Sequence, residues 1–164
     1  MAQDPEIDDS NEPAQLEVVA PPPTVAPQRK KPDLPIFAIL DKIDFSDHFV
    51  IIGDVGTGKS TVTPIHEFEL SGRSRRIIIR EPSRASCSAL FYSLEALHPE
   101  VKHELAVITK DTKINVGGKI EIVTDGVLLR MLAENSVVDS SIYFDESHQM
   151  SSQLELCLSL AKKE

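Results

Sequence analysis

The chain alternates between short hydrophobic runs and longer stretches in which hydrophobic residues recur at helical spacing. The short, mostly apolar runs occupy residues 49–52, 77–79 and 141–144. Continuous runs of this length are typical of strands that are buried on both faces of a parallel sheet. Each of the three runs is therefore predicted to be a strand.

Residues 119–123 follow a different pattern, in which apolar and charged side chains alternate. Residues 113–116 precede them, and Gly117 and Gly118 lie between the two segments. A glycine pair between two strand-like segments favours a tight turn, so this region is predicted to be a β-hairpin.

Helical spacing of apolar residues predicts helices at residues 60–70, 83–97, 126–134 and 149–162. A further helix is expected to begin at a cap provided by Asp33 and to extend to Ile43. Strands that alternate with helices require crossover connections. The predicted fold class is therefore α/β, a three-layer sandwich with a mainly parallel sheet.

The first 32 residues differ in composition from the rest of the chain. They are acidic and rich in proline, with Pro21, Pro22 and Pro23 in succession. Such a segment buries too little apolar surface to offset its conformational entropy. Residues 1–32 are predicted to be a disordered tail, a linker in preference to a docking peptide, and residues 33–164 a single domain.

Overall charge limits how the protein can bind nucleic acid. The net charge is −9 and the isoelectric point is about 5.0. Binding through bulk attraction to phosphates requires a basic surface, so any contact with nucleic acid must come from a local groove. Cys87 and Cys157 show no metal-ligand spacing, and reduced thiols are favoured over a disulfide. No apolar run is long enough to cross a bilayer and no signal peptide is evident, so a cytoplasmic location is expected.

A phosphate-binding loop is predicted directly after the first apolar run. The motif G-x-x-x-x-G-K-[ST] is matched without a gap, and the expected nucleotide contacts are Gly53, Asp54, Val55, Gly56, Thr57, Gly58, Lys59, Ser60 and Thr61. Backbone N–H groups and a helix N-terminus attract phosphate oxygens. Lys59 is predicted to reach the β- and γ-phosphates of ATP, and the Ser60 hydroxyl to bind Mg²⁺. The alternative is a glycine-rich turn with a surface lysine.

An acidic pair, Asp145 and Glu146, follows the last predicted strand. The carboxyl end of a buried parallel strand lies at the ligand-binding edge of an α/β sheet. Asp145 is predicted to bind Mg²⁺, and Glu146 to orient and deprotonate the attacking water. The alternative is that the pair caps a helix. Lys59, Asp145 and Glu146 are thus the predicted catalytic residues.

Several motifs resemble those of the DEAH/DExH helicases of superfamily 2. Asp145-Glu146-Ser147-His148 resembles the DExH box, and the Leu-Pro-Ile at 34–36 and Pro64 resemble residues that flank the phosphate loop of that family. Residues 81–84 are similar to motif Ia, and residues 124–130 to motif Ib. The resemblance implies a P-loop NTPase fold, the RecA-like first domain of a helicase, and an NTP hydrolase that moves on RNA.

The resemblance also implies which residues meet the RNA. By the resemblance, the residues expected to contact RNA are Ser83, Arg84, Thr124, Asp125 and Gly126. The RNA is expected to be single-stranded and bound without sequence preference. Without the resemblance, Ser83, Thr124 and Asp125 would be interpreted as helix caps. His148 is expected to couple the nucleotide site to a downstream motif, or else to be an ordinary polar residue.

The sequences of the phosphate loop and of residues 81–84 are similar to those in helicases of RNA-virus polyproteins, potyvirus-like or hypovirus-like, and a viral origin would imply a host-cytoplasmic location. The Thr-Asp-Gly segment at residues 124–130 is instead similar to the cellular members of the family. Motif III and a second RecA-like domain with its arginines are not found in the chain. We therefore expect a C-terminally truncated sheet with an exposed edge, and Mg-ATP binding with poor hydrolysis. The competing interpretations are a P-loop ATPase unrelated to nucleic acid and an inactive interaction fragment.

Overall fold

The computed structural model describes residues 34–149 and 151–162, so the predicted tail and the predicted cap Asp33 lie outside the described residues. The strands are β1 (Arg76–Glu81), β2 (Leu105–Ile108), β3 (Lys113–Ile114), β4 (Ile120–Thr124) and β5 (Ser140–Phe144). The α-helices are α1 (Lys59–Leu70), α2 (Arg84–Leu97), α3 (Asp125–Ala133) and α4 (Ser152–Ala161). Short 3-10 helices occupy Pro35–Ala38, Leu40–Lys42 and Pro99–Glu104.

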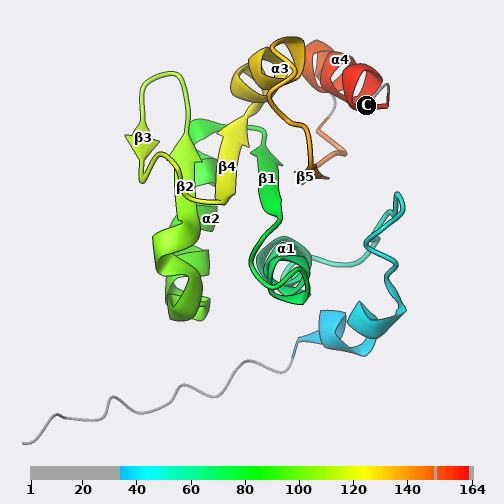
Figure 1. Cartoon of the computed structure of the whole chain (residues 1–164). Coiled ribbons are helices and arrows are strands. Elements are labelled where there is room, and N and C mark those ends of the chain that lie inside the picture. Colours follow the sequence, from blue (N-terminus) through cyan, green and yellow to red (C-terminus); the bar gives the residue numbers. More distant parts are fainter. Residues whose placement is uncertain (1–33, 150, 163–164) are drawn as a thin grey trace, which may run out of the picture. The chain divides into compact units, whose positions relative to one another are not determined.

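The strands form a five-stranded sheet in the order β3-β2-β4-β1-β5 (Figure 1). β1 pairs in parallel with both β4 and β5, and β2 pairs in parallel with β4. Only the short β3 runs antiparallel, beside β2. The mainly parallel sheet confirms the predicted fold class.

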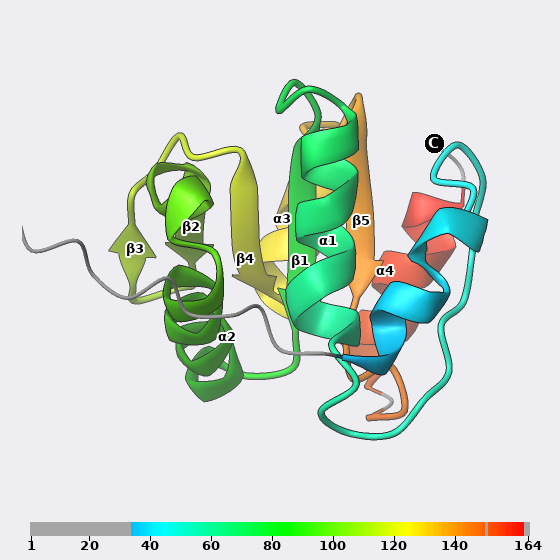
Figure 2. The same cartoon turned by 90° about the horizontal axis from the view of Figure 1, so that it is seen from below.

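Two hydrophobic cores lie on opposite faces of the sheet. Ile77 and Ile79 of β1 pack in one core with residues of α1 and α2, whereas Ile78 packs in the other with residues of α3 and α4. Successive side chains of a strand point to opposite faces, so the continuous apolar run supplies both cores. Figure 2 shows α1 and α2 in front of the sheet and α3 and α4 behind it, which are the three predicted layers.

The predicted strand at residues 49–52 is not formed. The segment carries no strand pairing, and the side chains of Val50 and Ile52 are 86% and 92% exposed. The neighbouring β5 pairs only with β1 among the described residues, so no ladder extends to this segment. Two contacts hold it instead: Ile51 packs on the cluster around Ile36, and the Phe49 ring lies 6.1 Å from that of Tyr143.

The predicted hairpin is also wrong, because β3 pairs with β2 and β4 inserts between β2 and β1. β2 itself, with the sequence Leu-Ala-Val-Ile, was not predicted. The turn between β3 and β4 folds back on the start of β2, where the Asn115 amide donates to the carbonyl oxygens of His103 and Leu105 at 2.7 and 2.9 Å. A side chain at Gly118 would collide with the Glu104 carbonyl oxygen, so the close approach requires glycine there.

Two predicted helices differ in extent. The first is replaced by the two short 3-10 helices, which begin after Leu34 without a side-chain cap. α4 begins at Ser152 rather than 149, because the Ser151 hydroxyl accepts a hydrogen bond from the Leu154 N–H at 3.0 Å and caps the helix there. Within the described residues, no helix has the length and apolar character needed to cross a membrane.

Candidate nucleotide and nucleic-acid site

The phosphate-binding loop turns sharply into α1 through two glycines in the left-handed region. Gly56 has φ +80° and Gly58 has φ +93°. A β-carbon on Gly58 would lie 2.9 Å from side-chain atoms of both Leu34 and Ile36, and the Ile36 N–H donates to the Thr57 carbonyl at 3.2 Å. The Leu-Pro-Ile segment therefore supports the loop from behind, and only glycine fits at position 58.

The Lys59 side chain folds over the loop. Its ammonium group donates to the carbonyl oxygens of Gly53 and Asp54 at 2.8 and 2.7 Å, and lies 3.3 Å from the Thr57 hydroxyl. A lysine held in this way differs from a freely solvated surface lysine. Ser60 and Thr61 follow in the first turn of α1 and are half-buried. The hydroxyl of Ser60 is an oxygen donor of the kind that Mg²⁺ prefers.

A buried carboxylate on α1 fixes that helix against β5. Glu67, 4% exposed, accepts hydrogen bonds from the hydroxyls of Ser141 and Tyr143, both at 2.5 Å, and the Arg75 guanidinium lies 3.5 Å away. Burial, and then the bond to Glu67, raise the pKa of Tyr143, which stays a donor. The loop before α1 and the turn after β5 lie at the same end of the sheet (Figure 2).

The acidic pair occupies a strained turn rather than a helix cap. Glu146 has φ +48°, a conformation that costs a non-glycine residue about 1–3 kcal/mol. The Asp145 carboxylate accepts from the Glu146 N–H at 2.9 Å, and the Glu146 carboxylate lies 3.3 Å from Nε2 of His148. Because α4 begins only at Ser152, the helix-cap alternative for the pair is wrong.

The sequence analysis assigned no role to two charged residues at the end of β1, Arg80 and Glu81, which are 0% and 4% exposed. Burial first, then the charge of Asp145, raise the pKa of Glu81 to about 7. The Arg80 guanidinium pairs with the Asp125 carboxylate. The available signal was that both charges directly follow the apolar run 77–79 and continue the buried strand.

The predicted RNA contacts gather at one edge of the sheet. Thr124 at the end of β4 is opposite Glu81 at the end of β1, so residues 83–84 and 124–126 follow neighbouring parallel strands. Ser83 caps α2 in a capping box with Ser86. Gly126 is exposed, whereas Thr124 is half-buried and makes no side-chain cap bond.

Two of these predicted contacts are already engaged. The Arg84 guanidinium pairs with the Asp111 carboxylate on the surface. Asp125 is 7% exposed and its carboxylate is bonded to Arg80, so only the backbone of Asp125 is available to a phosphate. The structure thus restricts the prediction at Asp125 to its N–H group.

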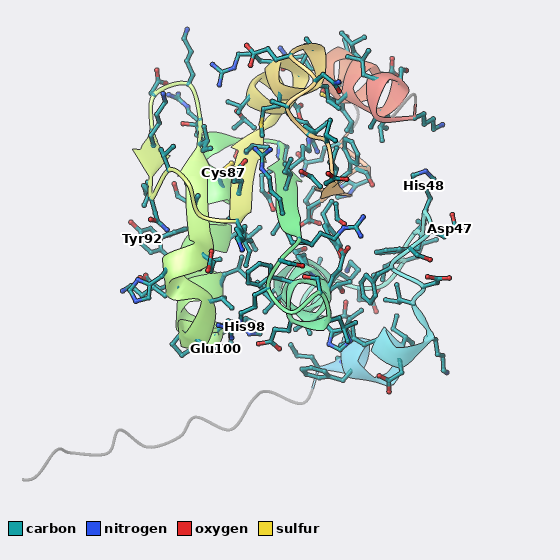
Figure 3. The ribbon with its side chains drawn as sticks, in the orientation of Figure 1. Asp47, His48, Cys87, Tyr92, His98 and Glu100 are labelled. Atoms are coloured by element: carbon teal, nitrogen blue, oxygen red, sulfur yellow. The ribbon has the colours of Figure 1, made fainter. Side chains whose placement is uncertain are left out.

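Both cysteines are free and buried, in the two cores on opposite faces of the sheet, so they form no disulfide with each other. Figure 3 shows Cys87 at the start of α2, and the His98–Glu100 pair beyond the other end of that helix. Burial, and next the charge of Glu81, raise the pKa of Cys87 to about 12. Cys87 is therefore a core residue and not a nucleophile.

Comparison with known proteins identifies similar helicases. No protein-family model matches the chain. It is 28% identical over 154 residues to the human ATP-dependent RNA helicase DHX33, a match that covers 86% of this chain and 21% of that protein. It is 27% identical over 162 residues to a Schizosaccharomyces pombe protein named as an ATP-dependent RNA helicase, covering 89% of this chain and 13% of that one.

A solved structure supports the same assignment. The crystal structure of the Escherichia coli DEAH/RHA helicase HrpB superposes with a TM-score of 0.69 at 26% identity, over 79% of this chain and 18% of that one. The chain thus spans about a fifth or less of each of these relatives. All three are cellular, so the resemblance to viral polyproteins gains no support. The chain thus has the α/β fold of a helicase domain and is similar to DEAH/RHA helicases.

Proposed function

We propose that this domain binds Mg-ATP and RNA at one edge of its sheet and couples ATP hydrolysis to movement on single-stranded RNA. One observation carries the proposal. The phosphate loop, the turn that holds Asp145 and Glu146 (the acidic turn) and residues 124–126 all follow or face the carboxyl ends of parallel strands. In open α/β sheets this edge is where ligands bind. The RNA helicases to which the chain is similar give the reaction class.

The loop binds the nucleotide through its backbone and Lys59. The ammonium group, now bonded to two carbonyl oxygens of the loop, exchanges them for phosphate oxygens. The Ser60 hydroxyl and the Asp145 carboxylate are oxygen donors that fit Mg²⁺. When bound, Mg²⁺ neutralises charge that develops on the transferred phosphoryl group.

Glu146 is placed to handle the attacking water. Its side chain is 42% exposed, and its backbone has φ +48° in the turn that follows β5. A carboxylate in this position accepts a hydrogen bond from water and orients it. His148, 3.3 Å from that carboxylate, is proposed to connect this site to parts of the helicase outside the described residues.

RNA is proposed to lie along residues 83–84 and 124–126. Exposed hydroxyl, guanidinium and backbone N–H groups suit phosphate oxygens and carry no sequence information. The N-terminus of α3 adds partial positive charge beside Gly126.

Hydrolysis is proposed to need a second domain. Arginines contributed across a cleft raise turnover by roughly 10³–10⁵ in related phosphoryl-transfer enzymes. The arginines of the described residues are all in ion pairs, at positions 73, 75, 76, 80, 84 and 130. We therefore propose that the chain alone binds ATP, hydrolyses it slowly and acts in the cytoplasm as part of a longer helicase.

Linked binding tests the proposal. A fluorescent ATP analogue with Mg²⁺ is titrated into the chain with and without a single-stranded RNA. Because coupled sites must change each other's affinity, RNA is expected to shift the dissociation constant, and Arg84→Ala to weaken RNA binding. An ATP affinity that saturating RNA leaves unchanged would contradict coupling.

A further inference from the structure

Arg80 is a buried cation that the reaction described above does not use. It lies at the end of β1 and is 0% exposed. Its Nε and Nη2 atoms donate to the two carboxylate oxygens of Asp125, the latter at 2.8 Å. A planar guanidinium held in this forked way is fixed in both position and orientation.

The same guanidinium also holds the peptide of the acidic turn. Nη1 of Arg80 donates to the Asp145 carbonyl oxygen at 2.9 Å, and the Arg80 carbonyl accepts from the Asp145 N–H at 3.1 Å. Arg80 therefore forms hydrogen bonds with both the N–H group and the carbonyl group of Asp145. A displacement of the Arg80 side chain changes where the Asp145 carboxylate can point.

On its other side, Arg80 connects with the proposed RNA-binding turn. Asp125 is the first residue of α3 and lies between Thr124 and Gly126. Its carboxylate accepts a further hydrogen bond from the Ser151 hydroxyl, at 3.1 Å, which caps α4. This cluster of Arg80, Asp125, Asp145 and Ser151 joins four segments that are distant in sequence.

Burial makes these contacts act together. Breaking the ion pair leaves an uncompensated charge in a low-dielectric interior, which is strongly unfavourable. When the turn at 124–126 moves, Asp125 therefore carries the guanidinium with it. Because Nη1 of that guanidinium is bonded to Asp145, the movement reaches the acidic turn.

We propose that Arg80 is a positioning residue that couples the RNA-binding turn at residues 124–126 to Asp145. This inference rests on the proposed function, since it specifies how RNA and ATP affect each other. Arg80 touches neither ligand; it acts through Asp145 on one side and Asp125 on the other.

Arg80→Lys is the variant that separates coupling from folding. Lysine keeps the positive charge beside Asp125, but one ammonium group does not reproduce a fork that bonds Asp125 and Asp145 at once. The matched control is Arg76→Lys on the same strand, because Arg76 pairs with Glu121 at 2.7 Å near the opposite end of β1. Both substitutions remove a guanidinium group from β1, but only Arg80 is bonded to the acidic turn.

The readout is the ratio of ATP-analogue dissociation constants with and without single-stranded RNA. Coupling of about 5- to 150-fold is typical for linked sites. We expect a ratio clearly different from one in the wild-type chain and in Arg76→Lys, and a ratio near one in Arg80→Lys. A wild-type ratio of one contradicts the proposed function itself. A wild-type ratio that Arg80→Lys retains overturns only the role of Arg80.

Hydrogen exchange in the wild-type chain decides the matter if Arg80→Lys does not fold. RNA alone is expected to slow exchange of the amides at residues 145–149, and the ATP analogue alone to slow exchange at residues 124–128. Protection confined to the site of the added ligand would overturn the proposal, because no movement would then pass through Arg80.

Discussion

The Arg84 guanidinium is already paired before any nucleic acid binds, because it contacts the Asp111 carboxylate on the surface. In the proposed RNA complex, phosphates compete with Asp111 for the Arg84 guanidinium. An exposed ion pair contributes about 0.2–1 kcal/mol, so Asp111→Asn is expected to raise RNA affinity by roughly 1.5- to 5-fold. Titration of a labelled single-stranded RNA measures this change.

The control for that measurement is Glu134→Gln. It removes the same amount of charge from a carboxylate that lies 4.0 Å from Arg130, which is outside the proposed RNA contacts. If both substitutions raise RNA affinity equally, the effect comes from net charge and Arg84 is not an RNA contact.

Glu81 is predicted to make stability depend on pH. Burial and the charge of Asp145 raise its pKa from 4.5 to about 7 in the folded chain. Between pH 4.5 and about pH 7, the folded chain therefore keeps a proton on Glu81 that the unfolded chain has lost. The contribution of Glu81 to stability decreases as the pH rises through this range. Glu81→Gln removes the ionisation. Its urea midpoint, relative to that of the wild type, is expected to be higher at pH 8 than at pH 5.

The direction of the pH dependence distinguishes a Glu81 whose pKa is raised by burial from one whose pKa is lowered or unchanged. A carboxylate stabilised by a cation would have a lowered pKa and would lose stability as pH falls. A difference between variant and wild type that is the same at pH 5 and pH 8 would show that Glu81 titrates normally.

The contact between α1 and β5 is predicted to depend on the Glu67 cluster. Tyr143→Phe removes the phenolic hydroxyl that donates to Glu67 at 2.5 Å and leaves a buried carboxylate with one partner fewer. We expect a loss of about 1–3 kcal/mol in the free energy of unfolding by urea. Tyr92→Phe on α2, where the side chain is 61% exposed, is the control, and equal losses in both would contradict the role of Glu67.

The elements that the sequence predicted correctly are those whose bounds depend on residues close together in the chain. α1 and α2 have apolar spacing and clear starts, at the phosphate loop and at the Ser83 cap, and both were predicted to within one residue. The strand predicted at 49–52 failed because a continuous apolar run forms a buried strand only where neighbours pair with it. The hairpin failed for a related reason, since the choice of β2 over β4 as the partner of β3 is not local.

The candidate site likewise contains residues that the sequence predicted and contacts that only the structure shows. The phosphate loop and acidic pair were predicted because their residues are adjacent in sequence. The bond from Arg80 to Asp125 spans 45 residues, and the bond from Tyr143 to Glu67 spans 76. No spacing rule identifies such pairs, since only the strand order brings them together.

The whole molecule is acidic, and its described arginines are committed to carboxylates. Apart from the proposed contact at Arg84, its affinity for polyanions is therefore expected to come from Lys59 and from backbone N–H groups of the phosphate loop and of the turn at residues 124–126. That arrangement suits a protein that binds a nucleotide tightly at one place and RNA transiently along an edge. ATP binding through Lys59 is the claim on which the other proposals depend.

Titration of a fluorescent ATP analogue into the wild-type chain and into Lys59→Ala, with Mg²⁺ present, tests that claim most directly. Lys113→Ala, which removes an exposed lysine from strand β3, is the control. A hydrogen bond to a charged group contributes about 1.5–3 kcal/mol, so we expect saturable binding that Lys59→Ala weakens by roughly 10- to 100-fold and Lys113→Ala leaves unchanged. Absence of binding, or binding that both variants retain, would contradict the account.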